Sequence, residues 1–361
     1  MMQQNKPDII ECCGTPYEIG RQYGEAAKEN IFKSVNFMFV SLENGFFKAP
    51  KDRVLNVADK YLENVREFDP GAVEWVRGIA DGSGISFQES FALKSYLEIA
   101  MHYPQLSGMC TSFALTGPAA KDGLTMIGQN IDWHPDTPID LLHIKHADGL
   151  EQLALCFLGN CTYYLNSAGI GNCSNLTISP MGPITHHIPL TIYLWKAMRQ
   201  PTIDEAMNIL GRAARGLGYY HLADRYGTIT GIESVYDDYT ILKPENHILV
   251  HANHYETEKY KKADLAYTYI QDSFGRSDRL RELISESFGN LTPKRMMGFL
   301  SDHQNFPDSV CNHIDNTKPP EMASMSKASF IMVPGELKMY IAFGPPCENQ
   351  YFEYSLPNRF I

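Results

Sequence analysis

Apolar residues in the first hundred positions recur with helical spacing, and this pattern gives way to short strands near residue 107. Thr15 and Ser86 are each followed three residues later by Glu, which is the capping box that opens a helix. Apolar positions from Ile19 to Ile31 fall on one face of the helix that follows Thr15. Further helices are predicted over residues 54–68, 72–80 and 86–101.

Turn signals and short runs of strand-forming residues dominate the second part of the chain. Asp122-Gly123 and Asp148-Gly149 each separate two such runs, as expected of β-hairpins. Strands are predicted over 111–115, 125–133, 141–147, 151–158, 163–178, 228–235, 239–243, 247–252, 328–333 and 337–343, with helices over 187–199, 203–215, 263–287 and 293–301. This order favours an α+β fold in which two antiparallel sheets lie between outer helices.

Composition limits the possible functions. The chain has 361 residues, 44% of them hydrophobic and 20% charged, so one integrated domain with a large core is expected. A net charge of −11 argues against nucleic acid or an anionic membrane as partner. Neither a signal peptide nor a membrane-spanning segment is predicted. A cytoplasmic protein is therefore expected, with most of its eight cysteines as free thiols.

Cys110 is the candidate nucleophile because of its position. Most cysteines without a metal or disulfide are buried and inert, so the residue alone is weak evidence. Cys110 however comes directly before the predicted strand 111–115, and Asp132 lies near the end of the strand 125–133 predicted to pair with it. A nucleophile and a carboxylate are thereby expected at the same end of two neighbouring strands.

Several motifs in the same order resemble one family along most of the chain. They lie at residues 14–20, 78–86, 110–112, 128–133, 251–254, 272–279, 302–313 and 342–347. Together they resemble the acyl-coenzyme A:6-aminopenicillanate acyltransferase-like family of N-terminal-nucleophile hydrolases, with the bile-salt and penicillin V amidases as distant relatives. The resemblance implies a four-layer αββα fold with two stacked antiparallel sheets.

The resemblance also implies that the chain cuts itself between Met109 and Cys110. Residues 1–109 would then be a helical N-terminal segment, and residues 110–361 would be the core that begins with the nucleophile. The new α-amine, whose ordinary pKa is about 7.7–8.0, would act as the base for its own thiol. Family members often have Gly before the nucleophile. Met109 departs from that pattern and is expected to slow the cleavage.

Four further residues receive roles from the resemblance. Asp132 corresponds to the aspartate that holds the α-amine, and Asn253 to the asparagine whose amide donates to the oxyanion. Asn175 corresponds to a second oxyanion donor, through its backbone. Arg276 corresponds to an arginine near the nucleophile, where its charge would lower the thiol pKa. Arg279 competes with Arg276 for that role.

Three functions use these residues differently. Water would complete hydrolysis of an N-acyl amide through a thioester on Cys110, and this is the main hypothesis. An amine could instead intercept the thioester, which makes the chain an acyltransferase. A non-catalytic binding protein on the same fold is the third hypothesis.

Expected partners are few. The substrate would be a small N-acyl amide or acyl thioester, no cofactor is implied, and a homo-oligomer remains open. His303, Cys311 and His313 form the best local group of metal-ligand residues. One residue between Cys311 and His313 is a poor spacing for a zinc site, so no metal is predicted and a scaffold role is preferred for the group.

Overall fold

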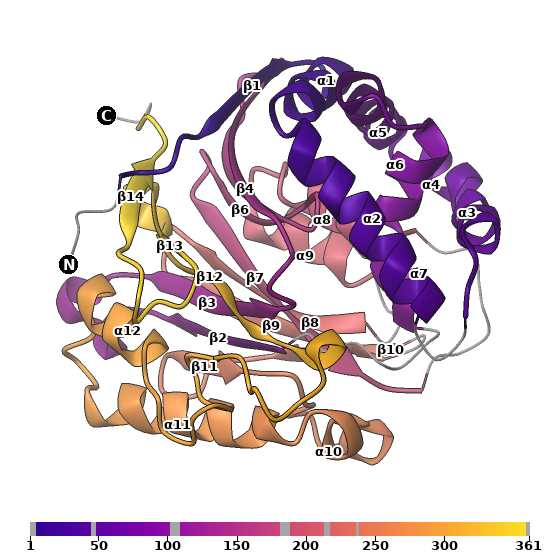
Figure 1. Ribbon diagram of the computed structural model, residues 1–361. Coiled ribbons are helices and arrows are strands. Elements are labelled where there is room, and N and C mark those ends of the chain that lie inside the picture. The colour runs from indigo at the N-terminus through magenta and orange to yellow at the C-terminus, as the bar shows by residue number, and fades with distance from the viewer. Residues whose placement is uncertain are drawn as a thin grey trace.

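Two β-sheets lie face to face between two layers of helices (Figure 1). The computed structural model describes residues 5–44, 48–101, 109–180, 188–212, 217–235 and 238–358. The predicted α+β architecture of four layers is confirmed within these residues.

The larger sheet has eight strands and carries one of the residues predicted for the site, Asn175. Its pairs are antiparallel except for the first two strands, which run parallel. Their order across the sheet is β1 (Ile10–Gly14), β4 (Ile139–His146), β5 (Glu151–Phe157), β6 (Asn160–Asn166), β7 (Ile170–Ile178), β8 (Leu217–Asp224), β9 (Ile229–Val235) and β10 (Asp238–Leu242).

The smaller sheet has six antiparallel strands and carries Cys110. Their order is β11 (Ile248–His251), β2 (Met109–Leu115), β3 (Met126–Trp133), β12 (Met325–Val333), β13 (Lys338–Phe343) and β14 (Phe352–Ser355). In the register, Met109 lies opposite Asp132 and Ser112 lies opposite His251. The start of β2 therefore meets the end of β3 and the end of β11 at one edge of the sheet.

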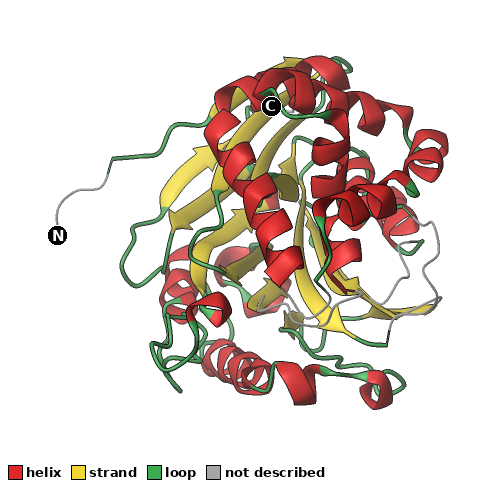
Figure 2. Ribbon diagram, turned by 45° about the vertical axis from the view of Figure 1, so that its right-hand side comes forward, coloured by secondary structure: helices red, strands yellow, loops and turns green. Residues whose placement is uncertain are grey.

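Helices form the two outer layers, which Figure 2 shows on either side of the strands. The layer on the larger sheet contains α1 (Pro16–Ala26), α2 (Lys28–Asn44), α3 (Lys51–Asp59), α4 (Leu62–Phe68), α5 (Pro70–Ser83), α6 (Phe87–Lys94), α7 (Tyr96–Met101), α8 (Leu190–Ala197) and α9 (Ile203–Leu210). The layer on the smaller sheet contains α10 (Ala266–Tyr269), α11 (Asp272–Glu286) and α12 (Pro293–Leu300). Burial of apolar surface between neighbouring layers stabilises the stack.

Glycines allow α1 and α5 to pack with their backbones almost in contact. A Cβ atom at Gly20 would lie 2.1 Å from the carbonyl oxygen of Trp75, and one at Gly82 would lie 2.2 Å from that of Arg21. Gly24 on α1 and Gly78 on α5 are equally crowded by backbone atoms of the facing helix. The two helices meet through small residues spaced four apart, which permits the close approach.

Most predicted elements are present, and the differences have local causes. Both capping boxes are formed, with Thr15 and Ser86 as the N-caps. The helix predicted to end before Gly82 extends to Ser83, because Gly82 is needed for packing against α1. The helices predicted over 54–68 and 86–101 are each divided in two. β1, β8 and β14 were not predicted, and β8 lacks the apolar alternation that identifies a strand.

Cysteine chemistry largely follows the expectation of free thiols. Six cysteines are free, and Cys156 and Cys161 form a disulfide between β5 and β6. The adjacent strands place these two residues opposite each other in the register.

The packing of α1 on α5 predicts that Gly78→Ala destabilises the protein. The added Cβ would lie 2.1 Å from the carbonyl oxygen of Tyr17, so the helices must separate at a cost of roughly 1–3 kcal/mol in the free energy of unfolding. Gly298→Ala is the matched control, because Gly298 lies in α12 with open space around its Cα. Urea unfolding should show an unchanged or slightly higher stability for the control. Equal effects of both substitutions would contradict the packing argument.

Candidate active site

Cys110 lies at the start of β2, and its own backbone groups are held by two side chains. It is 6% exposed. Its backbone nitrogen donates to Oδ1 of Asn253 at 2.8 Å, and its carbonyl oxygen accepts from Nη1 of Arg276 at 2.9 Å. The nucleophile predicted from sequence therefore sits in a fixed position beside two of the residues predicted with it.

Arg276 connects three elements around Cys110. Its guanidinium donates to Oδ2 of Asp272 in the same helix at 2.7 Å, to Oγ1 of Thr111 at 2.6 Å and to Oδ1 of Asn253 at 2.9 Å. The side chain is 1% exposed. Burial of a guanidinium is tolerated only when its donors are paired, and these contacts supply the pairing.

Arg279, the competing arginine, faces away from Cys110. Its Nη2 contacts Oδ2 of Asp302 at 2.9 Å and its Nη1 contacts Oε2 of Glu282 at 2.7 Å. Of the two arginines, Arg276 is the one with a hydrogen bond to Cys110 among the described residues, whereas Arg279 pairs with Asp302 after α12.

Asp132 has one satisfied and one unsatisfied carboxylate oxygen. The hydroxyl of Ser326 donates to Oδ1 at 2.6 Å. Oδ2 is buried and has no hydrogen-bond partner among the described residues. A buried carboxylate oxygen without a donor is costly, so this atom marks a place where a donor is expected.

Burial controls the ionisation of both Cys110 and Asp132. It raises the pKa of the Cys110 thiol to about 12; the Asp132 carboxylate adds to the rise, and Arg276 opposes it. It also raises the pKa of Asp132 to about 7, while Arg276 and the hydroxyl of Ser326 work in the other direction. The charge of Arg276 thus acts to lower the thiol pKa, but burial outweighs it, and the raised pKa favours the protonated thiol at neutral pH.

Asn253 and Asn175 occupy different surroundings. Asn253 follows β11, and its Nδ2 donates to the carbonyl oxygen of Leu176 at 2.8 Å. An amide nitrogen carries two hydrogens, so one is left for another acceptor. Asn175 on β7 accepts from the hydroxyl of Ser112 at 2.5 Å, and its Nδ2 donates to the carbonyl oxygen of His251 at 3.4 Å. The predicted oxyanion roles of both residues stay predictions.

Gln129 and Ser326 contribute to the site without having been given roles from the sequence. Gln129 bonds both backbone groups of Ser174, at 2.7 and 3.0 Å, and so ties β3 to β7 across the two sheets. Its side chain also lowers the thiol pKa of Cys110 through a hydrogen bond. Gln129 lies inside the motif at 128–133 and was detectable there. Ser326 is one of many serines and had no distinguishing signal.

Some predicted features lie outside the described residues. These are residue 187, at the start of the predicted helix 187–199, and residues 213–215, at the end of the predicted helix 203–215. For Met109 only the backbone is described, as the first residue of β2.

Comparison with known proteins agrees with the predicted resemblance. Residues 190–346 match the family described as acyl-coenzyme A:6-aminopenicillanic acid acyl-transferase. The chain is also 24% identical over 315 residues to the 40 kDa form of acyl-coenzyme A:6-aminopenicillanic-acid-acyltransferase from Emericella nidulans, covering 84% of both chains. This chain is related to that family. The segment matched by the family, residues 190–346, includes Asn253 and Arg276 and begins after Cys110.

Solved structures show weaker likeness. A conjugated bile acid hydrolase variant from Clostridium perfringens has a TM-score of 0.45 at 12% identity, covering 69% of this chain and 97% of that one. An N-acylethanolamine-hydrolyzing acid amidase ortholog from Caenorhabditis elegans has 0.46 at 15%, covering 69% and 100%. Penicillin V acylase from Agrobacterium tumefaciens has 0.47 at 13%, covering 68% and 86%. The fold assignment rests on the layers and strand order described above.

The matching family and the relative from Emericella nidulans are both named for the transfer of an acyl group to 6-aminopenicillanic acid. Among the described residues, none of the helices has the length and apolar character needed to cross a membrane.

The raised pKa of Asp132 predicts a pH-dependent effect of Asp132→Asn on stability. The folded-state pKa of about 7 lies above the ordinary value of 3.8, so ionisation of this carboxyl destabilises the fold. With rising pH, the unfolded chain loses the proton first, and stability falls until the folded state is ionised as well. Asp132→Asn removes this loss, so the free energy of unfolding of the variant should exceed that of the parent by up to roughly 4 kcal/mol at pH 8.

Urea unfolding from pH 4 to pH 8 measures this effect. Both proteins should carry Cys110→Ala, so that neither is cleaved. The difference in free energy of unfolding should grow between pH 4 and pH 7 and then level off. A difference that does not change with pH would show that Asp132 is not destabilised by its burial.

Proposed function

We propose that this protein is a self-processed cysteine amidohydrolase in which Cys110 is the nucleophile. One observation carries the proposal: the backbone nitrogen of Cys110 is held by Asn253, beside a buried aspartate with an unpaired oxygen. Cleavage before Cys110 would turn this nitrogen into an α-amine with additional hydrogens. The amine would supply a donor for Oδ2 of Asp132 at the point where the uncleaved chain has none.

Self-cleavage would follow an N-to-S acyl shift. The Cys110 sulfur attacks the carbonyl carbon of Met109, a C–S bond forms, the C–N bond breaks, and the thiol proton ends on the nitrogen. Water then opens the thioester, which leaves a carboxylate on Met109 and a free thiol and amine on Cys110. Asp132, with its pKa raised to about 7 by burial, is placed to accept and return the proton near neutral pH.

Catalysis would use the same atoms. The new α-amine removes the thiol proton, and the thiolate attacks the acyl carbon of an N-acyl amide. Asn253 donates to the oxyanion through its remaining amide hydrogen, and Asn175 contributes a backbone donor. The departing amine takes the proton, and water releases the acid from the thioester. Arg276 holds the carbonyl of Cys110 and the amide of Asn253 in their relative positions.

Location and assembly remain proposals as well. Six free cysteines support the cytoplasm as the compartment, because thiols stay reduced there. Assembly as a homo-oligomer stays a prediction.

Cleavage is tested by the intact mass of the denatured protein. The parent should give fragments of 109 and 252 residues, which add up to the full 361. Cys110→Ala should stay at full length. Arg276→Lys should slow the cleavage by roughly 10²-fold, because Lys cannot hold the carbonyl of Cys110 and Asn253 together. Arg279→Lys is the control on the same helix and should cleave like the parent.

A parent protein that stays at full mass after prolonged incubation would exclude the α-amine mechanism. Rapid alkylation of Cys110 in the parent, with Cys110→Ala as the blank, would then separate a cysteine enzyme that needs no cleavage from a binding protein. A binding protein on this fold would show neither cleavage nor fast alkylation.

Acyl transfer is the second candidate, and the relative from Emericella nidulans favours it, since its name is that of an acyltransferase. The two reactions differ only in what opens the thioester. Cleaved protein should be given a panel of acyl amides with peptide-like, N-acyl amino acid, penicillin-type and bile-acid groups, with and without an added primary amine. Mass spectrometry should show mainly free acid for the hydrolase, because water competes at about 55 M without needing a site. New amide as the main product would establish the transferase.

A further inference from the structure

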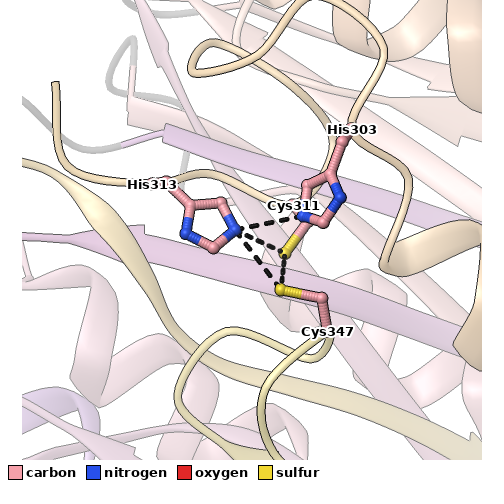
Figure 3. Close-up of side chains that lie close together, drawn as sticks. All are labelled: His303, Cys311, His313 and Cys347. Atoms are coloured by element: carbon pink, nitrogen blue, oxygen red, sulfur yellow. Dashed lines mark hydrogen bonds between the residues drawn. The ribbon is translucent and has the colours of Figure 1, made fainter.

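Four metal-ligand side chains come together between two loops of the smaller sheet (Figure 3). His303, Cys311 and His313 lie in the loop between α12 and β12, and Cys347 lies between β13 and β14. Their ligand atoms all lie within 4.8 Å of one another. Figure 3 shows the side chains pointing to a common centre.

Four of the six distances between ligand atoms in this cluster are close to the edges of a tetrahedron around zinc. With Zn–S bonds of about 2.3 Å and Zn–N bonds of about 2.0–2.1 Å, two sulfurs lie about 3.8 Å apart, sulfur and nitrogen about 3.6 Å, and two nitrogens about 3.3 Å. The sulfurs of Cys311 and Cys347 are 3.6 Å apart. Nε2 of His313 lies 3.5 and 3.4 Å from these sulfurs and 3.1 Å from Nε2 of His303.

Hydrogen bonds alone do not explain the arrangement. Nε2 of His313 faces three atoms at once, Nε2 of His303 and the sulfurs of Cys311 and Cys347. An imidazole nitrogen has either one N–H or one lone pair, so it can satisfy one of these neighbours. A cation at the centre would give all four atoms the same partner.

The backbone folds to present the ligands. The amide of Cys311 donates to the carbonyl oxygen of Asp302 at 3.0 Å, which closes the first loop. Arg279 holds Asp302 from the side. In the second loop the amide of Glu348 donates to the carbonyl oxygen of Pro345 at 3.0 Å, which makes the turn that carries Cys347.

We propose that His303, Cys311, His313 and Cys347 bind a structural zinc ion. A ligand set of two cysteine sulfurs and two imidazole nitrogens is typical of tetrahedral zinc. Four protein ligands leave no open position, so the role is structural. Binding releases the two thiol protons to solvent, and the two thiolates balance the charge of Zn²⁺. His303 and Cys347 are exposed, which gives the ion a path of entry.

The ion would also support Asp132. Asn312, between two of the ligands, exchanges two hydrogen bonds with Ser326, each at 3.0 Å: its amide donates to the Ser326 hydroxyl, and the Ser326 amide donates to its carbonyl oxygen. The hydroxyl of Ser326 in turn donates to Asp132. Zinc binding would therefore fix the loop that positions Ser326. This proposal does not depend on the proposed amidase activity, since metal content is measured independently.

The spacing of the four ligands along the sequence does not resemble a zinc motif, so the sequence alone did not predict the site. Cys311 and His313 are too close for a familiar zinc motif, and Cys347 follows only after β12 and β13 have formed a hairpin. The pairing of these strands brings the second loop back to the first.

Metal content of the full-length protein is the test. Protein purified under reducing conditions without chelator should contain about one zinc ion per chain, as measured by inductively coupled plasma mass spectrometry. Titration with an organomercurial thiol reagent should release that zinc into a colorimetric indicator. Cys347→Ser and His303→Ala should each lose most of the zinc. Cys13→Ser is the control, because Cys13 is an exposed thiol outside the cluster, and it should keep the zinc.

Three outcomes would overturn the proposal. They are a parent protein without zinc after zinc is supplied, zinc retained by both cluster variants, and a disulfide between Cys311 and Cys347 in the freshly purified reduced protein. If the variants fail to fold, the parent protein still tests the proposal. Replacement of its zinc by cobalt should give the strong visible absorption of tetrahedral cobalt with thiolate ligands, and weak octahedral absorption would exclude this ligand set.

Discussion

The buried guanidinium of Arg276 is the contact on which the geometry of the candidate site depends. It joins α11 to the start of β2 and to the residue after β11, and it does so inside the protein, where water does not replace lost contacts. A charge in this position is tolerated because Asp272, Thr111 and Asn253 accept its donors. The position of Cys110 relative to Asn253 is therefore set by one planar group with fixed donor directions.

The second constraint is the burial of Cys110 together with Asp132. Two acids that share a water-poor site do not both ionise easily, and burial raises the pKa of each. The uncleaved chain thus holds a protonated thiol beside a carboxyl that titrates near neutral pH. An α-amine added by cleavage would change this balance, because its positive charge would favour both anions. This change is the reason why the proposed cleavage would favour ionisation at the site.

Much of the fold could be predicted because its signals are local. Capping boxes at Thr15 and Ser86 and the turn at Asp148-Gly149 depend on neighbouring residues only, and the structure contains the expected elements. The strand β8 could not be predicted because its residues from Gly218 to Asp224 are all buried in the larger sheet, which leaves no alternation of exposed and buried positions. The choice between Arg276 and Arg279 needed the direction of α11 relative to β2, which no local pattern contains. The cluster around Cys311 likewise depends on the pairing of β12 with β13.

Helix α11 contacts both the candidate active site around Cys110 and the loop that carries three of the proposed zinc ligands. One of its faces directs Arg276 to Cys110, and the neighbouring face directs Arg279 to Asp302, which closes the loop of the proposed zinc ligands. That loop returns to the candidate site through Asn312, Ser326 and Asp132. The path is closed, since Asp132 and Arg276 act on the same thiol. The cluster of His303, Cys311, His313 and Cys347 lies outside the site itself, yet these contacts link it to Cys110 from two sides.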